Sequence, residues 1–219
     1  MRLVFFDTET SGLDPVVDRI IEIALLVVEE GSVKVKLDKF IKHDFQISDR
    51  IQELTGISNE LLDELGDSEE FVASMVFDLL SEGSLMIAHN CQFDLNFLYQ
   101  LLCRYYSVGV VDELFASMEW LDTLTVFKDR KGYPHKLVDM CNYYGIRDIR
   151  FHRALDDTLA LSKCVKALNR ERNDLVAYFN VFGFNPKYGV SGEEFSFIRY
   201  VPQEFNDGLV GKDFILPLL

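Results

Sequence analysis

The sequence predicts an α/β protein whose core is one mixed, five-stranded sheet flanked by helices. Short runs rich in apolar and β-branched residues indicate buried strands, and two of them meet at a glycine turn. Longer amphipathic stretches alternate with the later runs. Because consecutive strands favour antiparallel pairing and strands separated by helices favour parallel pairing, we expect an antiparallel meander followed by parallel strands.

The five expected strands are short and apolar. The first run is too short and too apolar for an amphipathic helix. The next two are joined at Glu30-Gly31, which indicates a hairpin turn. In chain order the predicted strands cover residues 2–7, 19–30, 33–42, 84–90 and 120–127.

Amphipathic periodicity predicts helices between and after these strands. Two short helical patches lie around residues 48–65, and a longer helix starts near Asp67 and Ser68, which are candidate N-terminal caps. Its inward face is expected to carry Phe71, Val72, Met75, Val76, Leu79 and Leu80. Further helices are predicted at residues 93–106, 136–144 and 153–172.

The composition is acidic, with 36 acidic and 22 basic side chains in 219 residues and a formal charge of −14 at pH 7. This charge argues against coating of nucleic acid or anionic membranes by bulk attraction, although bound cations can reverse the sign locally. Four scattered cysteines without a CxxC pair favour buried thiols over disulfides. With no signal-peptide pattern and no long apolar run, we expect a cytoplasmic protein that does not bind membranes.

The composition and residue pattern of the sequence change after residue 172. Residues 1–172 are expected to form the main domain, and residues 173–219 a packed C-terminal extension of unknown role. The extension is aromatic, punctuated by glycine and partly alternating, which predicts one or two strands. One strand is expected to place Phe195, Phe197 and Arg199 on one face and Ser196, Ile198 and Tyr200 on the other.

Acidic residues follow apolar segments at three places. Asp7 and Glu9 end the first strand, and Asp94 starts the helix after the strand at 84–90. Asp157 follows His152 by five positions at the start of the last helix. Taken singly, each acid is typical of a helix cap or a solvated loop residue.

The last helix separates Asp157 from its neighbour Asp156. Its apolar stripe consists of Ala154, Leu161, Val165 and Leu168. Asp157 lies within this stripe, whereas Asp156 lies about 100° round the helix, in line with Lys163 and able to pair with Arg153. Since a lone buried carboxylate is costly unless it is paired or bound to a metal, Asp157 needs a partner on the inner face.

Four acids, Asp7, Glu9, Asp94 and Asp157, would repel one another if they gathered at one end of the sheet. Bound cations relieve such repulsion, and clusters of carboxylate oxygens suit Mg²⁺ or Mn²⁺ rather than Zn²⁺. Two such ions about 4 Å apart are recurring machinery for phosphodiester cleavage. The pattern therefore predicts a site for two divalent metal ions.

Three motifs carry a resemblance to the DEDD superfamily of 3′–5′ exonucleases. They are FDTETSGLD with Asp7 and Glu9, HNCQFD with Asp94, and HRALDD with His152 and Asp157. Over about residues 1–170 the chain resembles the DEDDh branch, which includes the proofreading ε subunit of bacterial DNA polymerase III and related DnaQ-like exonucleases. The resemblance implies a ribonuclease H-like fold, two Mg²⁺ or Mn²⁺ ions held by the four acids, and His152 as general base.

The resemblance also implies residues that bind the substrate. These are Thr10, Leu13, Thr55, Ile57 and Asn90. Leu13 and Ile57 are expected either to sandwich the terminal base or to pack in the core. Thr55 stands where relatives often have a histidine, and Asn90 is expected to bond backbone or a sugar. His135, in a segment that matches a structural helix of the family, is expected at the surface.

The expected partner is the 3′ end of a nucleic acid, with single-stranded DNA favoured because an acidic surface fits a small end-trimming footprint. RNA remains an alternative, since no short motif reports the 2′-hydroxyl. A DNA polymerase or another replication protein is a further candidate partner, and the oligomeric state is open.

Two other classes fit the sequence less well. A haloacid-dehalogenase-like phosphatase would need an aspartate at the second acidic position of DTET and a later GDxxxD motif, and the chain has neither. A catalytically silent nucleic-acid-binding module would be expected to have lost metal ligands, whereas all four acids and His152 are present.

Overall fold

A computed structural model describes residues 1–80, 83–147 and 153–204 of the chain. Its strands are β1 (Arg2–Thr10), β2 (Ile20–Glu29), β3 (Ser32–Lys42), β4 (Asp67–Ser68), β5 (Ser84–Ala88), β6 (Glu119–Asp122), β7 (Val181–Phe184) and β8 (Arg199–Pro202). They form one sheet in the order β4-β3-β2-β1-β5-β6-β7-β8. The first three strands are an antiparallel meander, and β1, β5, β6, β7 and β8 are parallel. The predicted mixed sheet is confirmed, and its five expected strands are extended at both edges.

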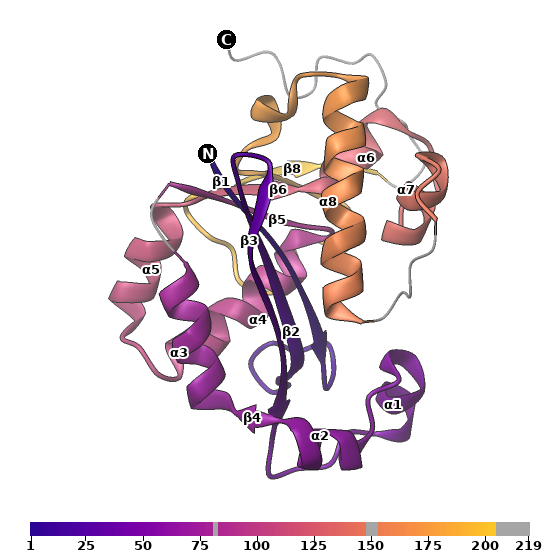
Figure 1. Cartoon of the computed structure of the whole chain (residues 1–219). Helices are drawn as coiled ribbons and strands as arrows, with labels where there is room; N and C mark the ends of the chain where they lie inside the picture. The colour runs from indigo at the N-terminus through magenta and orange to yellow at the C-terminus, as the bar shows by residue number, and fades with distance from the viewer. Residues whose placement is uncertain (81–82, 148–152, 205–219) are drawn as a thin grey trace.

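Helices cover both faces of this sheet (Figure 1). They are α1 (Asp49–Thr55), α2 (Asn59–Leu65), α3 (Glu69–Leu79), α4 (Cys91–Cys103), α5 (Val108–Ala116), α6 (Thr123–Arg130), α7 (Leu137–Tyr143) and α8 (Ala154–Glu171), with a short 3₁₀ helix, η1 (Leu175–Tyr178). One hydrophobic cluster packs α3, α4 and α5 on one face, and a second packs α6, α7 and α8 on the other. Throughout the described residues, each helix is too short or too polar to cross a membrane.

The strand expected at 120–127 is wrong beyond Asp122. The Asp122 carboxylate accepts the backbone N–H groups of Leu124 and Thr125 and so caps α6. This capping outweighs the β propensity of the apolar and β-branched residues that follow. No helix is predicted at 108–116, because glycine and valine favour helices weakly. α5 forms there because one of its faces packs into the core.

Two predicted faces also differ from the structure. Phe71, expected inside, is 49% exposed, with the Lys39 ammonium 5.8 Å from its ring centroid. In the extension, the expected strand at 195–200 begins only at Arg199, because a turn in which the Ile198 N–H donates to the Phe195 carbonyl precedes it. This turn buries both Phe195 and Ile198, which a strand would have placed on opposite faces.

All four cysteines, at positions 91, 103, 141 and 164, are free thiols, so the predicted preference for thiols over disulfides is confirmed. Three of them are buried, and Cys103 is half-buried. The Sγ atoms of Cys141 and Cys164 lie 3.5 Å apart where α7 packs on α8.

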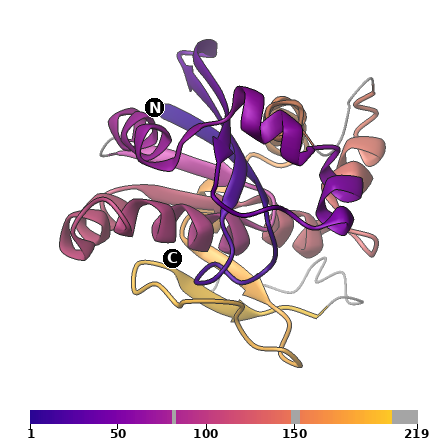
Figure 2. The ribbon, with the colours of Figure 1, turned by 90° about the horizontal axis from the view of Figure 1, so that it is seen from below.

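The described part of the extension continues the sheet beyond β6. Asn180 joins the two segments, because its N–H donates to the Trp120 carbonyl at 2.7 Å and its side-chain oxygen accepts the Trp120 N–H at 2.8 Å. Phe182 and Phe195 belong to the main hydrophobic cluster. In the view from below, the extension lies along the molecule on the far side of α4 from the meander (Figure 2).

Phe182→Ala should destabilise the whole protein, because Phe182 is 1% exposed and packs in the main cluster. We expect the free energy of unfolding to fall by about 3–5 kcal/mol. Urea denaturation, followed by far-UV circular dichroism and by fluorescence of the single tryptophan, should show one transition. Val176→Ala, at a side chain that is 75% exposed, should change stability by less than about 0.5 kcal/mol. Separate transitions for the two probes would mean that the extension folds independently.

Candidate active site

The acids of the first motif lie at the carboxyl end of β1, on the face covered by α8. Side chains alternate across a strand, so Phe5, Asp7 and Glu9 share one face. Phe5 packs in the cluster with α8, whereas Phe6 packs in the cluster with α4. One carboxylate oxygen from each of Asp7, Glu9 and Asp157 lies within 4.8 Å of the other two.

Asp157 reaches this cluster from the first turn of α8. Its side chain is 8% exposed, whereas Asp156 is half-buried, as the helical periodicity predicts. The start of α8 is fixed by Glu22 of β2, which accepts the N–H of Ala154 at 3.3 Å and Arg153 Nε at 3.0 Å. Arg153 therefore forms its ion pair with Glu22. The sequence suggests Asp156 as its partner instead.

Asp94 approaches from the opposite face of β1, in the first turn of α4. Its Oδ1 atom accepts hydrogen bonds from the backbone N–H and the hydroxyl of Thr8, at 3.0 and 2.6 Å. Asp94 is 4% exposed, and its charge is the largest cause after burial that raises the pKa of Asp7. Acids from three elements thus converge on the end of β1.

A further carboxylate, Asp122 at the end of β6, holds the start of α4. Its Oδ1 atom accepts the N–H groups of Asn90 and Cys91 at 3.0 and 3.1 Å. The same side chain caps α6 through Leu124 and Thr125. One buried acid therefore fixes two helix N-termini and, through α4, the position of the acid in its first turn.

Burial and mutual repulsion raise the pKa values of the clustered acids. The pKa of Asp7 lies well above its usual value, first through burial and then through the charges of Asp94 and Asp157. Burial, followed by the charge of Asp157, raises the pKa of Glu9 to about 8. Burial raises the pKa of Asp94 to about 7, although hydrogen bonds from Thr8 oppose this shift. Near neutral pH the cluster must keep protons or bind cations.

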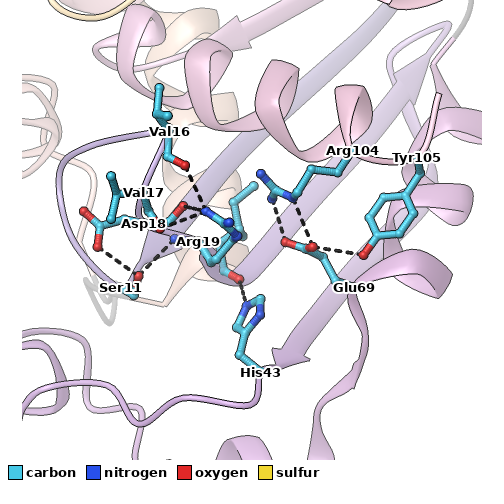
Figure 3. A network of polar contacts seen from close by, with 10 residues as sticks. Ser11, Val16, Val17, Asp18, Arg19, His43, Glu69, Arg104 and Tyr105 are labelled. Carbon is cyan, nitrogen blue, oxygen red and sulfur yellow. Dashed lines mark hydrogen bonds and ion pairs between the residues drawn. The ribbon is translucent and has the colours of Figure 1, made fainter. Parts of the chain in front are cut away.

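The loop after Glu9 is held by polar contacts (Figure 3). Arg19 Nη1 donates to three backbone carbonyls of the loop at 2.8 to 3.2 Å, and the Ser11 hydroxyl donates to Asp18 at 3.3 Å. These contacts order a loop whose apolar side chains face solvent. Its exposed members are Leu13 at 82%, Val16 at 67% and Val17 at 72%.

The five residues expected to bind substrate differ in their exposure. Leu13 is exposed on the loop, and Asn90 is exposed at the start of α4 with a left-handed φ of 69°. Thr10 and Thr55 are buried, and their hydroxyls donate to backbone carbonyls at 2.6 and 2.9 Å. Ile57 is fully buried in a small cluster beside α1 and α2. For Ile57 the structure therefore shows core packing, the alternative to base stacking.

The structure gives a different result for each of three histidines, His152, His135 and His89. His152 lies outside the described residues. His135, expected at the surface, is 4% exposed, because its ring packs against Phe127 and its Nε2 atom bonds the Lys131 carbonyl at 2.8 Å. His89 Nε2 donates to the His135 carbonyl at 2.8 Å, and burial lowers the pKa of His89. His89 thus joins the end of β5 to the loop before α7.

Sequence reasoning did not single out Glu22 or Asp122. Both acids stand within apolar runs, IIEIALLVV and WLDTLTVF. The test that selected Asp157, a carboxylate in an apolar stretch that needs a partner, would have selected these two as well.

A mixed sheet of this order, flanked by helices, is a ribonuclease H-like fold, and its acidic residues gather at the end of the central strand β1. The RNase_T family model, described as Exonuclease, matches residues 4–165. The chain belongs to this exonuclease family. The matched segment contains all four acids of the three motifs.

Two curated relatives are similar over most of this chain. The DNA polymerase III PolC-type protein of Thermotoga petrophila is 35% identical over 155 residues, which are 70% of this chain and 11% of that protein. The 3′-5′ exonuclease DinG of Bacillus subtilis is 35% identical over 161 residues, which are 71% of this chain and 16% of that protein. The chain therefore spans only a small part of either relative's length.

Solved structures of exonuclease I from E. coli share the fold. Its zinc-bound complex with single-stranded DNA has a TM-score of 0.72 at 19% identity, covering 81% of this chain and 42% of that one. Its complex with a dT13 oligonucleotide has a TM-score of 0.72 at 18% identity, covering 81% and 43%. At this level of identity the likeness concerns the fold alone.

The protein without bound cations should lose stability as the pH rises, because acids with raised pKa values bind more protons in the folded than in the unfolded state. The loss should begin above about pH 4, where the unfolded acids ionise. It should continue to about pH 7 through Asp94 and about pH 8 through Glu9. Thermal unfolding in EDTA across this range measures the effect.

Asp7→Asn should flatten this pH profile and raise the free energy of unfolding near pH 8 by about 1–3 kcal/mol, since it removes one of the repelling charges. Asp156→Asn makes the same chemical change on a half-buried neighbour of the cluster and should leave the profile unaltered. An unchanged profile in Asp7→Asn would contradict the repulsion.

Proposed function

We propose that this protein is a 3′–5′ exonuclease that releases nucleoside monophosphates from single-stranded DNA by metal-dependent phosphodiester hydrolysis. The observation that carries the proposal is the convergence of Asp7, Glu9 and Asp157 within 4.8 Å, with Asp94 beside them. Membership of the exonuclease family supports the reaction class, and the DinG relative is named as a 3′-5′ exonuclease.

The donor set fits hard divalent cations. All of the clustered groups are carboxylates, which favours Mg²⁺ or Mn²⁺. Burial and then the repulsion of neighbouring acids raise the pKa values of Asp7 and Glu9, and a cation would relieve the repulsion. We assign Asp7, Glu9, Asp94 and Asp157 as the ligands of two ions. When bound, such ions activate water and stabilise the leaving oxygen.

The chain's own groups position the reaction. Thr8 restricts rotation of the Asp94 carboxylate through two hydrogen bonds, and the pairing of Glu22 with Arg153 fixes the start of α8. We assign His152 as the general base, which accepts a proton from the attacking water. An imidazole suits this step because its ordinary pKa of about 6.5 lies near neutrality.

Single-stranded DNA is the proposed substrate class, and a DNA polymerase or replication protein the proposed partner. The PolC-type relatives are DNA polymerases, and exonuclease I of E. coli is solved with single-stranded DNA. The net charge of −14 opposes long, tight contact with a polyanion and fits a small footprint at a strand end. The exposed Leu13 offers a sequence-tolerant contact for the terminal base.

Asp157→Asn should remove nearly all nuclease activity and weaken Mn²⁺ binding, because it takes one charge from the cluster. Asp156→Asn is the matched control and should keep turnover within a few-fold, since Asp156 is half-buried outside the cluster and Arg153 pairs with Glu22 instead. Nuclease rates and Mn²⁺ titrations of both variants provide the measurement. EDTA should abolish activity, and Mg²⁺ or Mn²⁺ should restore it. Full turnover of Asp157→Asn would refute the metal assignment.

His152→Ala should show a third pattern. Mn²⁺ affinity should stay close to that of the wild type, whereas the rate should fall by roughly 10²–10⁴-fold through loss of the proton acceptor. Equal losses of metal affinity and rate would reject the role of general base.

One gel measures both the direction of degradation and the preference for DNA or RNA. Linear DNA labelled at its 5′ end should shorten progressively from the 3′ end, and a 3′-phosphate should resist, because the site takes a free terminal nucleotide. A matched RNA should be degraded more slowly. Faster loss of the RNA would identify an exoribonuclease, and cleavage of a circular single strand would reveal an endonuclease.

A further inference from the structure

Two neighbouring hollows share Asn90 and Leu124 as lining residues. One, of about 430 Å³, is bounded by residues 133–137 and by His89. The other, of about 180 Å³, is bounded by α4, by α6 and by residues 182–185 and 189–191 of the extension, with the turn at residues 186–188 between them. The extension and the loop before α7 therefore form opposite sides of one depression.

The order of the sheet places this depression in line with the acidic cluster. β1, β5, β6 and β7 are parallel neighbours, so their carboxyl ends lie side by side at the same end of the sheet. Asp7 lies towards that end of β1, Asn90 follows β5, Asp122 ends β6 and Phe184 ends β7. The hollows thus continue the line of the cluster towards the extension.

The side formed by the extension is anchored to the helix that carries Asp94. Gln92 Nε2 donates to the carbonyls of Ser191 and Glu193 at 2.8 and 2.7 Å. The N–H of Glu193 donates to Asn96 Oδ1 at 2.8 Å. Because Gln92 and Asn96 flank Asp94, these bonds hold the extension in a defined place relative to the cluster.

Aromatic and basic side chains occur together around the hollows, in a chain whose net charge is −14. Tyr133 at the larger hollow is 67% exposed, and Tyr188, in the turn of the extension, is 72% exposed. Lys136 lines the larger hollow, and Lys187 Nζ lies 5.1 Å from the ring centroid of Tyr188. Lys128 lines the smaller hollow but is 5% exposed, and burial lowers its pKa. Stacking surfaces interleaved with positive charge suit single-stranded nucleic acid.

We propose that the two hollows bind the nucleotides of single-stranded DNA upstream of the 3′-terminal one, and that residues 182–191 form the far side of this track. The acid in the lining, Asp139, accepts the backbone N–H of Lys136 at 2.8 Å, so its charge is partly satisfied by the protein. The proposal rests on the proposed exonuclease function. It gives a binding role to an extension that lies outside the matched family segment at 4–165.

Binding of 5′-fluorescein oligodeoxythymidylates to the full-length protein in EDTA tests the track apart from catalysis. By fluorescence anisotropy, an oligomer of about 12 nucleotides should bind at least about 10-fold more tightly than one of about 3, because only the longer one fills the track. Tyr133→Ala and Tyr188→Ala should each weaken binding of the longer oligomer by about 5- to 100-fold. For Lys136→Glu and Lys187→Glu, the slope of log affinity against log salt concentration should become shallower by about 0.7 each.

Lys34→Glu is the matched control. Lys34 is an exposed lysine of β3 that lies level with the amino end of β1, at the end of the sheet away from the acidic cluster. The same charge reversal there should leave the dependence of affinity on oligomer length intact. Equal affinity of the wild type for both lengths would overturn the track. So would losses in Lys34→Glu as large as those in the track variants.

Hydrolysis in Mg²⁺, measured on the same proteins, separates the two proposals. A wild type that degrades DNA while the track variants bind normally keeps the exonuclease function and refutes the track. A wild type that binds long oligomers through the track without hydrolysing them keeps the track and refutes the function. Tighter binding of matched RNA than of DNA would overturn DNA as the occupant.

Discussion

Repulsion among the carboxylates at the end of β1 is the constraint on which the rest of the structure depends. Asp7, Glu9, Asp94 and Asp157 come from three elements, and the charges of the other three add to the effect of burial in raising the pKa of Asp7. Without opposing contacts, this repulsion would favour separation of β1, α4 and α8. The fold instead keeps the acids together, so the free energy of their repulsion can be released when a proton or a cation binds.

The contacts that oppose this repulsion are themselves made by acids. Glu22 accepts an N–H at the start of α8, and Asp122 accepts N–H groups at the starts of α4 and α6. A helix N-terminus carries partial positive charge and free N–H groups, so a buried carboxylate is satisfied there while it fixes the helix. Acidic residues therefore have two roles in this fold: those at helix N-termini position the helices, and those at the end of β1 face one another.

Helix α4 connects the C-terminal extension to the acidic site. Phe182 and Phe195 are buried in the main cluster, and Gln92 bonds two carbonyls of the extension from the first turn of α4. Asp94 lies in that turn, so packing of the extension and geometry of the acids are coupled through one short stretch of backbone. A segment that the family model does not match is thereby bonded to the helix that carries Asp94.

By itself the sequence predicted the meander and the parallel strands, the acids that the structure brings together and the deeper burial of Asp157 than of Asp156, because strand alternation and helical periodicity are local properties. The strand predicted at 120–127 was wrong beyond Asp122, because the β propensity of these residues competes with the helix cap that Asp122 provides. Only the tertiary structure decided that Glu22 holds the start of α8. Its bond to the N–H of Ala154 joins residues 132 positions apart, and a contact of that span leaves no periodicity in the sequence.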